Sequence, residues 1–142
     1  MASTKPSPTW SPPDRRSETT KPATGYQCLD PARGRCLAKR VERADSPWSR
    51  ARGLLGRSGL EPGQALWLAP CRQVHTFFMR FAIDVIFLDQ TGKVLRLCRR
   101  MAPWRISPWV AGAGSALELA GGGADGLALG DRLEFVPKED GW

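Results

Sequence analysis

The sequence predicts a mainly β fold, namely a small β-sandwich or partly closed barrel with one short helix, preceded by a disordered N-terminal tail. Short segments rich in Val, Ile, Leu and Phe recur about every ten residues, with Gly, Pro and Asp between them. The first 25 residues instead contain five prolines, with Trp10 as their one aromatic side chain. We therefore expect a tail over residues 1–30, one domain over 31–137 and a short C-terminal tail over 138–142.

Length and composition fit a single domain. The chain has 142 residues, of which 42% are hydrophobic and 25% charged. No apolar run reaches the roughly 18 residues that span a bilayer, and the N-terminus lacks the apolar segment of a secretory signal. We expect a cytoplasmic monomer that does not contact a membrane.

The charge is uneven along the chain. The formal net charge is +7, and residues 51–110 carry nine basic against three acidic side chains. A basic domain attracts nucleic acid through its phosphates, but net charge alone discriminates poorly between partners. Nucleic-acid binding is therefore kept as an alternative and is not favoured.

The first half of the domain shows two strand patterns and one helix pattern. A weakly patterned strand is predicted over residues 35–43, and a continuous apolar run over 65–69 predicts a buried strand. Between them, Asp45 and Pro47 are typical of a helix start, which predicts a short helix over residues 48–55.

The second half has the stronger β pattern. Its β-branched and aromatic residues predict strands over residues 73–79, 83–88, 93–101, 115–120 and 132–136. Residues 89–92 predict a hairpin turn in which Gly92 has a positive φ. We expect Trp104 and Trp109 to pack their loop onto the domain, and the glycine-rich connection 121–130 to hold one helical turn.

The segment from His75 to Asp89, HTFFMRFAIDVIFLD, runs from an aromatic-Met-Arg triplet to an apolar strand interrupted by an aspartate. This pattern resembles the signature of a bacterial and archaeal family known as domain of unknown function 192, or uncharacterised protein family 0127. Further motifs at residues 52–57, 117–121 and 130–131 resemble that family in the same order, with Leu55 where Met is usual. The resemblance implies a compact β domain and no particular reaction.

Asp84 interrupts an apolar strand. Side chains alternate along a strand, so Asp84 shares a face with Ile86 and Leu88, where a carboxylate is costly unless it is paired. We favour a structural role, with the carboxylate bound by an arginine such as Arg52 or by backbone N–H groups in a turn. A role as general acid or base, or as an anchor for a polar ligand, is the alternative.

Glu118 lies in a similar setting, between Ala116 and Ala120. Two such acids could form an acid/base pair across a cleft, which gives the hypothesis of a small hydrolase-like enzyme that uses Asp84 and Glu118.

His75 is the single histidine, and the four cysteines contain no C-x-x-C pair. Cys71 and His75 are too far apart along one strand to bind one metal ion unless Cys28, Cys36 or Cys98 joins them. A nucleophilic Cys-His dyad likewise requires that Cys98 approaches His75 from a neighbouring strand. The sequence therefore predicts no metal, no cofactor and reduced thiols. No convergent catalytic set is visible, so whether the chain is an enzyme stays open.

The leading hypothesis is a non-enzymatic β domain that binds a small molecule or a protein. Its candidate binding residues are Arg52, His75, Met79, Arg80, Asp84 and Glu118.

Overall fold

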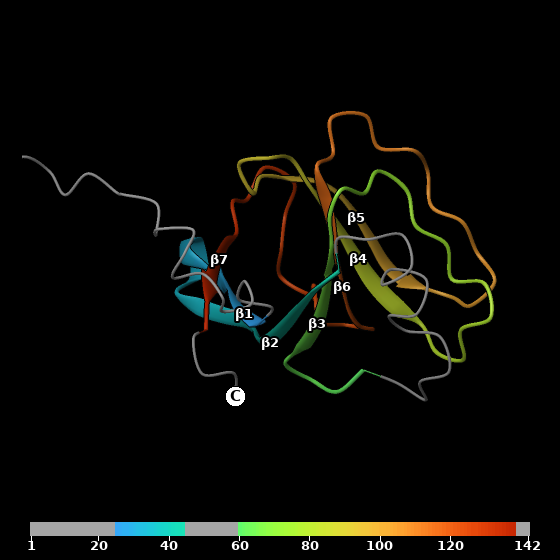
Figure 1. Ribbon diagram of the computed structural model, residues 1–142, viewed down its shortest axis with the longest axis horizontal. Coiled ribbons are helices and arrows are strands. Elements are labelled where there is room, and N and C mark those ends of the chain that lie inside the picture. Colours follow the sequence, from blue (N-terminus) through green and yellow to red (C-terminus); the bar gives the residue numbers. More distant parts are fainter. Residues whose placement is uncertain (1–24, 45–59, 139–142) are drawn as a thin grey trace, which may run out of the picture.

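The computed structural model describes residues 25–44 and 60–138, and the strands within these ranges form one mixed sheet of seven strands (Figure 1). The mainly β prediction is confirmed. In chain order the strands are β1 (Gly25–Asp30), β2 (Arg35–Ala44), β3 (Gln64–Leu68), β4 (Ile83–Leu88), β5 (Val94–Met101), β6 (Ser115–Ala120) and β7 (Glu134–Pro137). In the described part of the chain the one helical element is the 3₁₀ turn η1 (Pro31–Arg33). The helix predicted over residues 48–55 lies outside the described residues.

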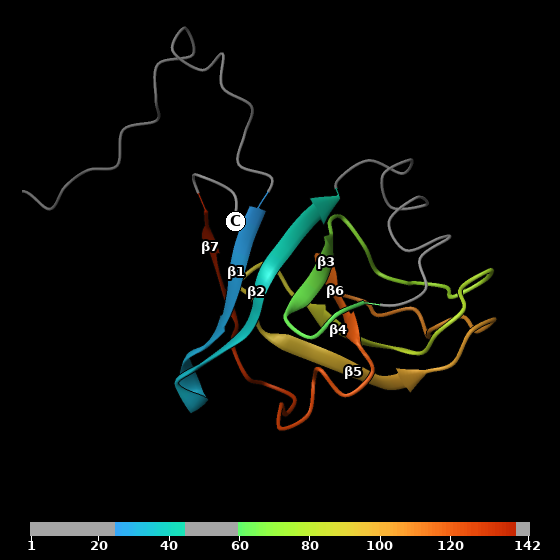
Figure 2. The same ribbon diagram turned by 90° about the horizontal axis from the view of Figure 1, so that it is seen from below.

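The strands lie in the order β5-β4-β6-β3-β2-β1-β7. All neighbouring strands are antiparallel except β2 and β3, which are parallel. β4 is buried at all six positions, five of which are apolar and one of which is Asp84. The sheet is strongly bent, and Figure 2 shows β1 and β7 running across the direction of β5.

The two faces of the sheet each cover a hydrophobic core. On one face, Val85 and Phe87 of β4 pack with residues from the loops before β4 and after β5, such as Met79 and Val110, and we call this the loop-side core. On the other face, Ile86 and Leu88 pack with residues of the remaining strands inside the bend, which we call the inner core. The alternation of side chains along β4 therefore assigns its odd and even positions to different cores.

The two edges of the sheet meet at one end and are not otherwise closed into a barrel. There the β4–β5 turn and the first residue of β5 bond to the segment before β7: the Leu133 N–H donates to Gly92 O (2.9 Å) and the Val94 N–H to Asp131 O (2.7 Å). Gly92 has φ +89°, as predicted, and a Cβ there would lie 2.4 Å from Leu133 O. Both the turn and this close approach therefore require glycine.

Residues 25–30, which we assigned to the N-terminal tail, form β1 and pair with both β2 and β7. Cys28 and Asp30 are fully buried in it. The Asp30 carboxylate accepts hydrogen bonds from Arg35 Nε (2.9 Å) and Arg33 Nη1 (3.4 Å). Gln27 and the buried Asp30 interrupt the apolar pattern of this short segment, which is why the strand was not predicted from the sequence.

Residues 73–79 do not form the predicted strand, and a single bridge pairs His75 with Ile106. In this segment, hydrogen bonds between polar side chains and backbone groups take the place of a regular strand ladder. The connection 121–130 consists of turns without the predicted helical turn. The remaining strand predictions are confirmed within a few residues at their ends.

Gly92→Ala tests the joined edges. We expect it to lower the free energy of unfolding by about 3 kcal/mol, because it combines an unfavourable φ with a clash against Leu133 O. Gly63→Ala is the matched control, since Gly63 has φ +87° but no atom within 4 Å of the added methyl group, and it should cost about 1 kcal/mol. Equal losses in urea unfolding would mean that the close approach contributes nothing.

Candidate functional site

The Asp84 carboxylate is fully buried and has a structural role. A register shift in the β4–β5 ladder leaves Arg99 and Arg100 opposite Asp84, which is a β-bulge. Asp84 Oδ1 accepts the backbone N–H of Arg100 (2.7 Å), and Oδ2 accepts that of Ala124 in the glycine-rich turn (2.9 Å). Both oxygens thus bind backbone donors, as one of the two structural interpretations expected.

Glu118 is also buried, at 5% exposure, but its carboxyl group forms no hydrogen bond or ion pair with the residues that the structure describes. The strand register places it between Leu66 of β3 and Val85 of β4. This apolar burial raises the pKa of Glu118 to about 8. The side chain is therefore mostly protonated at neutral pH.

The two acids do not form the acid/base pair of the hydrolase hypothesis. In the β4–β6 ladder Asp84 is paired with Leu119, a member of the inner core, whereas Glu118 is paired with Val85 of the loop-side core. Directly paired residues share a face. The carboxyl groups consequently lie on opposite faces of the sheet, with the backbone between them.

The other candidate residues lie in the loop before β4, apart from Arg52, which is outside the described residues. His75 and Arg80 are exposed, and Met79 is buried in the loop-side core beneath them. The His75 ring accepts a hydrogen bond at Nδ1 from the backbone N–H of Phe77 (3.3 Å). The structure therefore brings His75, Met79 and Arg80 into one loop and separates them from Asp84.

The described cysteines are Cys28, Cys36, Cys71 and Cys98, and they form no disulfide with one another. Burial raises the pKa of the Cys28 thiol, which makes it unreactive. Among residues 25–44 and 60–138, no three His, Cys, Asp or Glu side chains converge as metal ligands do.

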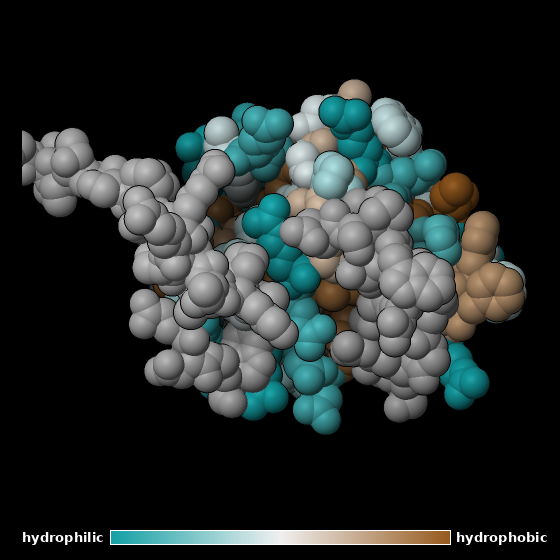
Figure 3. All heavy atoms as spheres, viewed as in Figure 1, coloured by the Kyte–Doolittle hydropathy of each residue, from teal (hydrophilic) through white to brown (hydrophobic). Residues whose placement is uncertain are grey.

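Instead, exposed aromatic side chains gather where two long loops, residues 70–82 and 102–114, extend beyond the sheet. Five of the seven large hydrophobic side chains that are exposed in the described residues lie in these loops. Figure 3 shows brown and tan side chains at the right-hand edge, where both loops end in Figure 1. We call the cluster of His75, Phe77, Phe78, Trp104 and Ile106 the loop-tip patch.

The aromatic rings of the loop-tip patch contact one another. Phe78 and Trp104 have ring centroids 4.6 Å apart, and those of His75 and Phe77 are 4.9 Å apart. Phe78 is 68% exposed and Trp104 55%. The prediction that Trp104 and Trp109 pack their loop onto the domain is wrong, because both face solvent and the loop is held by other groups.

Those other groups are buried hydroxyls. Thr76 Oγ1 donates to Ala102 O (2.6 Å) and accepts the N–H of Arg105 (2.9 Å), while Ser107 Oγ accepts the N–H of Val74 (3.0 Å). Backbone bonds add to this, such as Thr76 N–H to Arg105 O (2.8 Å). These positions were not predicted from the sequence, because a Thr or Ser residue does not indicate by its type which loop its hydroxyl will bind.

The loop-tip patch also holds backbone strain. Phe78 has φ +67° and Trp104 φ +64°, values that are costly for bulky side chains and favour glycine. Strained residues persist where the surroundings hold them, and they concentrate at binding sites. Here the strain presents two aromatic rings to solvent.

Comparisons with known proteins agree with the motifs. The model of the family DUF192, described as "Uncharacterized ACR", matches residues 30–135. The chain belongs to this family. A UPF0127 protein of Thermococcus sibiricus is 30% identical over 119 residues, which cover 79% of this chain and 76% of that protein. The family description assigns no reaction.

Two solved structures share the fold of this DUF192 chain. A Sinorhizobium meliloti protein described as a "putative transcription regulator" is 24% identical, with a TM-score of 0.65 over 78% of this chain and 92% of its own. A protein of unknown function from Novosphingobium aromaticivorans is 19% identical, with a TM-score of 0.67 over 87% of this chain and 99% of its own.

Asp84→Ala tests the role of the buried carboxylate. We expect a loss of about 3 kcal/mol in the free energy of unfolding, because the N–H groups of Arg100 and Ala124 lose their acceptors. Asp125→Asn in the same turn is the control, since Asp125 is exposed and its pair with Arg100 is superficial. A loss below about 1 kcal/mol for Asp84→Ala would exclude this anchoring role.

Glu118 gives a pH-dependent prediction. The pKa of Glu118 is about 8 in the folded chain and near 4.5 when unfolded, so between these values unfolding releases a proton. Stability should fall by up to about 1.4 kcal/mol per pH unit across that window and level off above it. Glu118→Gln should remove this part of the slope in urea unfolding at pH 5, 7 and 9. An unchanged slope in the variant would contradict the prediction.

Proposed function

We propose that this DUF192 chain is a non-enzymatic binding domain whose loop-tip patch docks on an apolar, acidic surface of a partner protein. The observation that carries the proposal is the pair Phe78 and Trp104. Both are more than half exposed, and both have a backbone conformation that a bulky residue adopts at a cost. In the free chain, burial does not offset the cost of exposing these two rings and of straining their backbone. This indicates that the rings stabilise a complex in which a partner covers them.

Trp104 in the loop-tip patch and the arginines of the same two loops belong to residue types that are enriched at protein-binding hot spots. Trp and Arg are the residue types that contribute most to protein interfaces, and they contribute most where the contact excludes water. The hydroxyls of Thr76 and Ser107 hold the two loops together before any partner arrives. A partner therefore meets a largely preformed surface.

The charge around the loop-tip patch indicates the charge of the partner's surface. The two loops contain Arg72, Arg80 and Arg105 and no acidic residue. Arg80 is exposed and forms no ion pair with the described residues. Acidic side chains around an apolar centre would complement this arrangement.

Nucleic-acid binding is the second candidate, favoured by the basic central region and by the description of the Sinorhizobium meliloti protein. Single strands bind by stacking bases on free aromatic faces along a groove. In the loop-tip patch the rings contact one another at a projecting tip, so fewer faces are free. For this reason we favour a protein partner.

The test starts by finding the partner at the patch. A photo-crosslinking amino acid replaces Trp104 in the full chain, and in a control it replaces Leu129, which lies outside the patch and is also more than half exposed. The protein crosslinked at position 104 and not at 129 is then purified. We expect Trp104→Ala to weaken its binding by about tenfold or more, and high salt to weaken it further.

Phe78→Gly separates binding from folding. Glycine accepts φ +67° without strain, so stability should be unchanged or slightly higher, whereas partner binding should weaken. The proposal fails if position 104 gives the same crosslinks as position 129. It also fails if the patch variants instead abolish binding to oligonucleotides or to anionic vesicles.

A further inference from the structure

A second region of the chain has an unsatisfied polar group that faces a groove. Trp67 of β3 has its indole Nε1 buried, and this nitrogen has no hydrogen-bond partner in the described residues. Buried indole N–H groups are nearly always bonded. None of the residues of the loop-tip patch lines this groove, so the inference is independent of the proposed function.

The Trp67 ring is fixed by its neighbours. Phe135 of β7 stacks on the ring with centroids 3.8 Å apart and an interplanar angle of 3°. The Arg43 guanidinium carbon lies 4.7 Å from the ring centroid, and Tyr26 contacts Trp67 edge to face at 5.2 Å. With its surroundings packed in this way, the ring cannot turn to find another acceptor, and the direction of its N–H is set.

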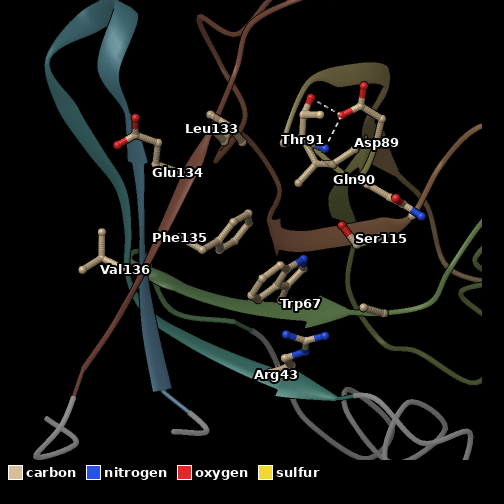
Figure 4. A pocket seen from close by; sticks show the side chains of 14 residues that line it. Arg43, Trp67, Asp89, Gln90, Thr91, Ser115, Leu133, Glu134, Phe135 and Val136 are labelled. Carbon is tan, nitrogen blue, oxygen red and sulfur yellow. Dashed lines mark hydrogen bonds between the residues drawn. The ribbon is translucent and has the colours of Figure 1, made fainter. Parts of the chain in front are cut away.

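This N–H lies at a groove of about 530 Å³, within the size range of small-molecule sites. The groove runs between the turn at residues 89–92 and the segment 133–136, with Ser115 beside the indole. Figure 4 shows the nitrogen of Trp67 directed toward Ser115 and the turn, while Glu134 points away from the ring. Leu88, Leu133 and Phe135 supply apolar wall.

At the indole end the groove offers donors, whereas Asp89 lies in the turn at its rim and Glu134 points away from the ring (Figure 4). The Ser115 hydroxyl forms no hydrogen bond, and Arg43 no ion pair, with the described residues. Asp89 is an acceptor on the rim, but its Oδ1 already accepts the Thr91 N–H (2.8 Å), the Thr91 hydroxyl (2.7 Å) and the Lys93 N–H (3.0 Å). A ligand therefore meets the indole N–H, a hydroxyl and a guanidinium.

The geometry points to a binding site for a small monocarboxylate with an apolar body, whose carboxylate accepts the Trp67 indole N–H beside Ser115 and Arg43. The apolar body would lie against the half-buried Phe135, behind which Leu133 and Leu88 are buried. No covalent step is involved. Because Nε1 is buried, the side chains around it shift when the carboxylate binds, while the stacked ring keeps its orientation.

The probe is benzoate, added to the ¹⁵N-labelled full chain, with benzylamine as a cation of the same shape. The chain has six tryptophans, and Trp67→Phe identifies the indole N–H signal of Trp67. We expect this signal to move and saturate with benzoate, and to stay in place with benzylamine.

Two variants keep the result interpretable if Trp67→Phe does not fold. Arg43→Gln should weaken benzoate binding by about tenfold, because it removes a charge-assisted contact. Arg96→Gln, an exposed arginine on β5 outside the groove, should leave the affinity unchanged. The inference is overturned if benzoate moves the Trp67 indole signal no more than benzylamine does. It is also overturned if the two arginine variants bind benzoate with equal affinity.

Discussion

The structure depends on the buried carboxylate of Asp84. It bonds to the bulge in β5 and to the glycine-rich turn after β6, so a central strand, an edge strand and a connection are held at one point. With the bulge fixed, β5 ends where the second long loop begins, and the two loops can pair. A charged group inside an apolar strand is thus the fixed point from which the projecting loops are positioned.

Most of the sheet could be predicted from the sequence, and the loop-tip patch could not. β4 and β6 follow from apolar segments that one acidic residue interrupts in each, and the turn at Gly92 follows from its residue types. Residues 73–79 look like a strand because their apolar content is high, but the Thr76 hydroxyl supplies the bonds of a paired loop instead. Whether Trp104 packs or projects depends on the partner loop, 26 or more residues away, which periodicity does not record. Asp84 and Glu118 look alike in sequence, and only the register shows that they face different cores.

Three features lower the stability of the free chain without an evident benefit to its structure. They are the protonated Glu118, the unbonded indole of Trp67 and the left-handed backbone at Phe78 and Trp104. Natural sequences usually satisfy local rules, and they depart from them mainly where another requirement applies. Two of these three features, the indole of Trp67 and the backbone at Phe78 and Trp104, lie at surfaces to which we assign binding. Glu118 is part of neither binding surface, and its predicted effect is on the pH dependence of stability.

The pairing of the two long loops has a further consequence. Since the hydroxyl and backbone bonds join the loops chiefly to each other, the side chains at their ends contribute little to the sheet. The tips of the two loops can therefore vary in sequence while the sheet stays constant, as the variable loops of other β proteins do. Relatives with the same strands could consequently have drifted toward unrelated partners, so that a common ancestry need not imply a common biological role.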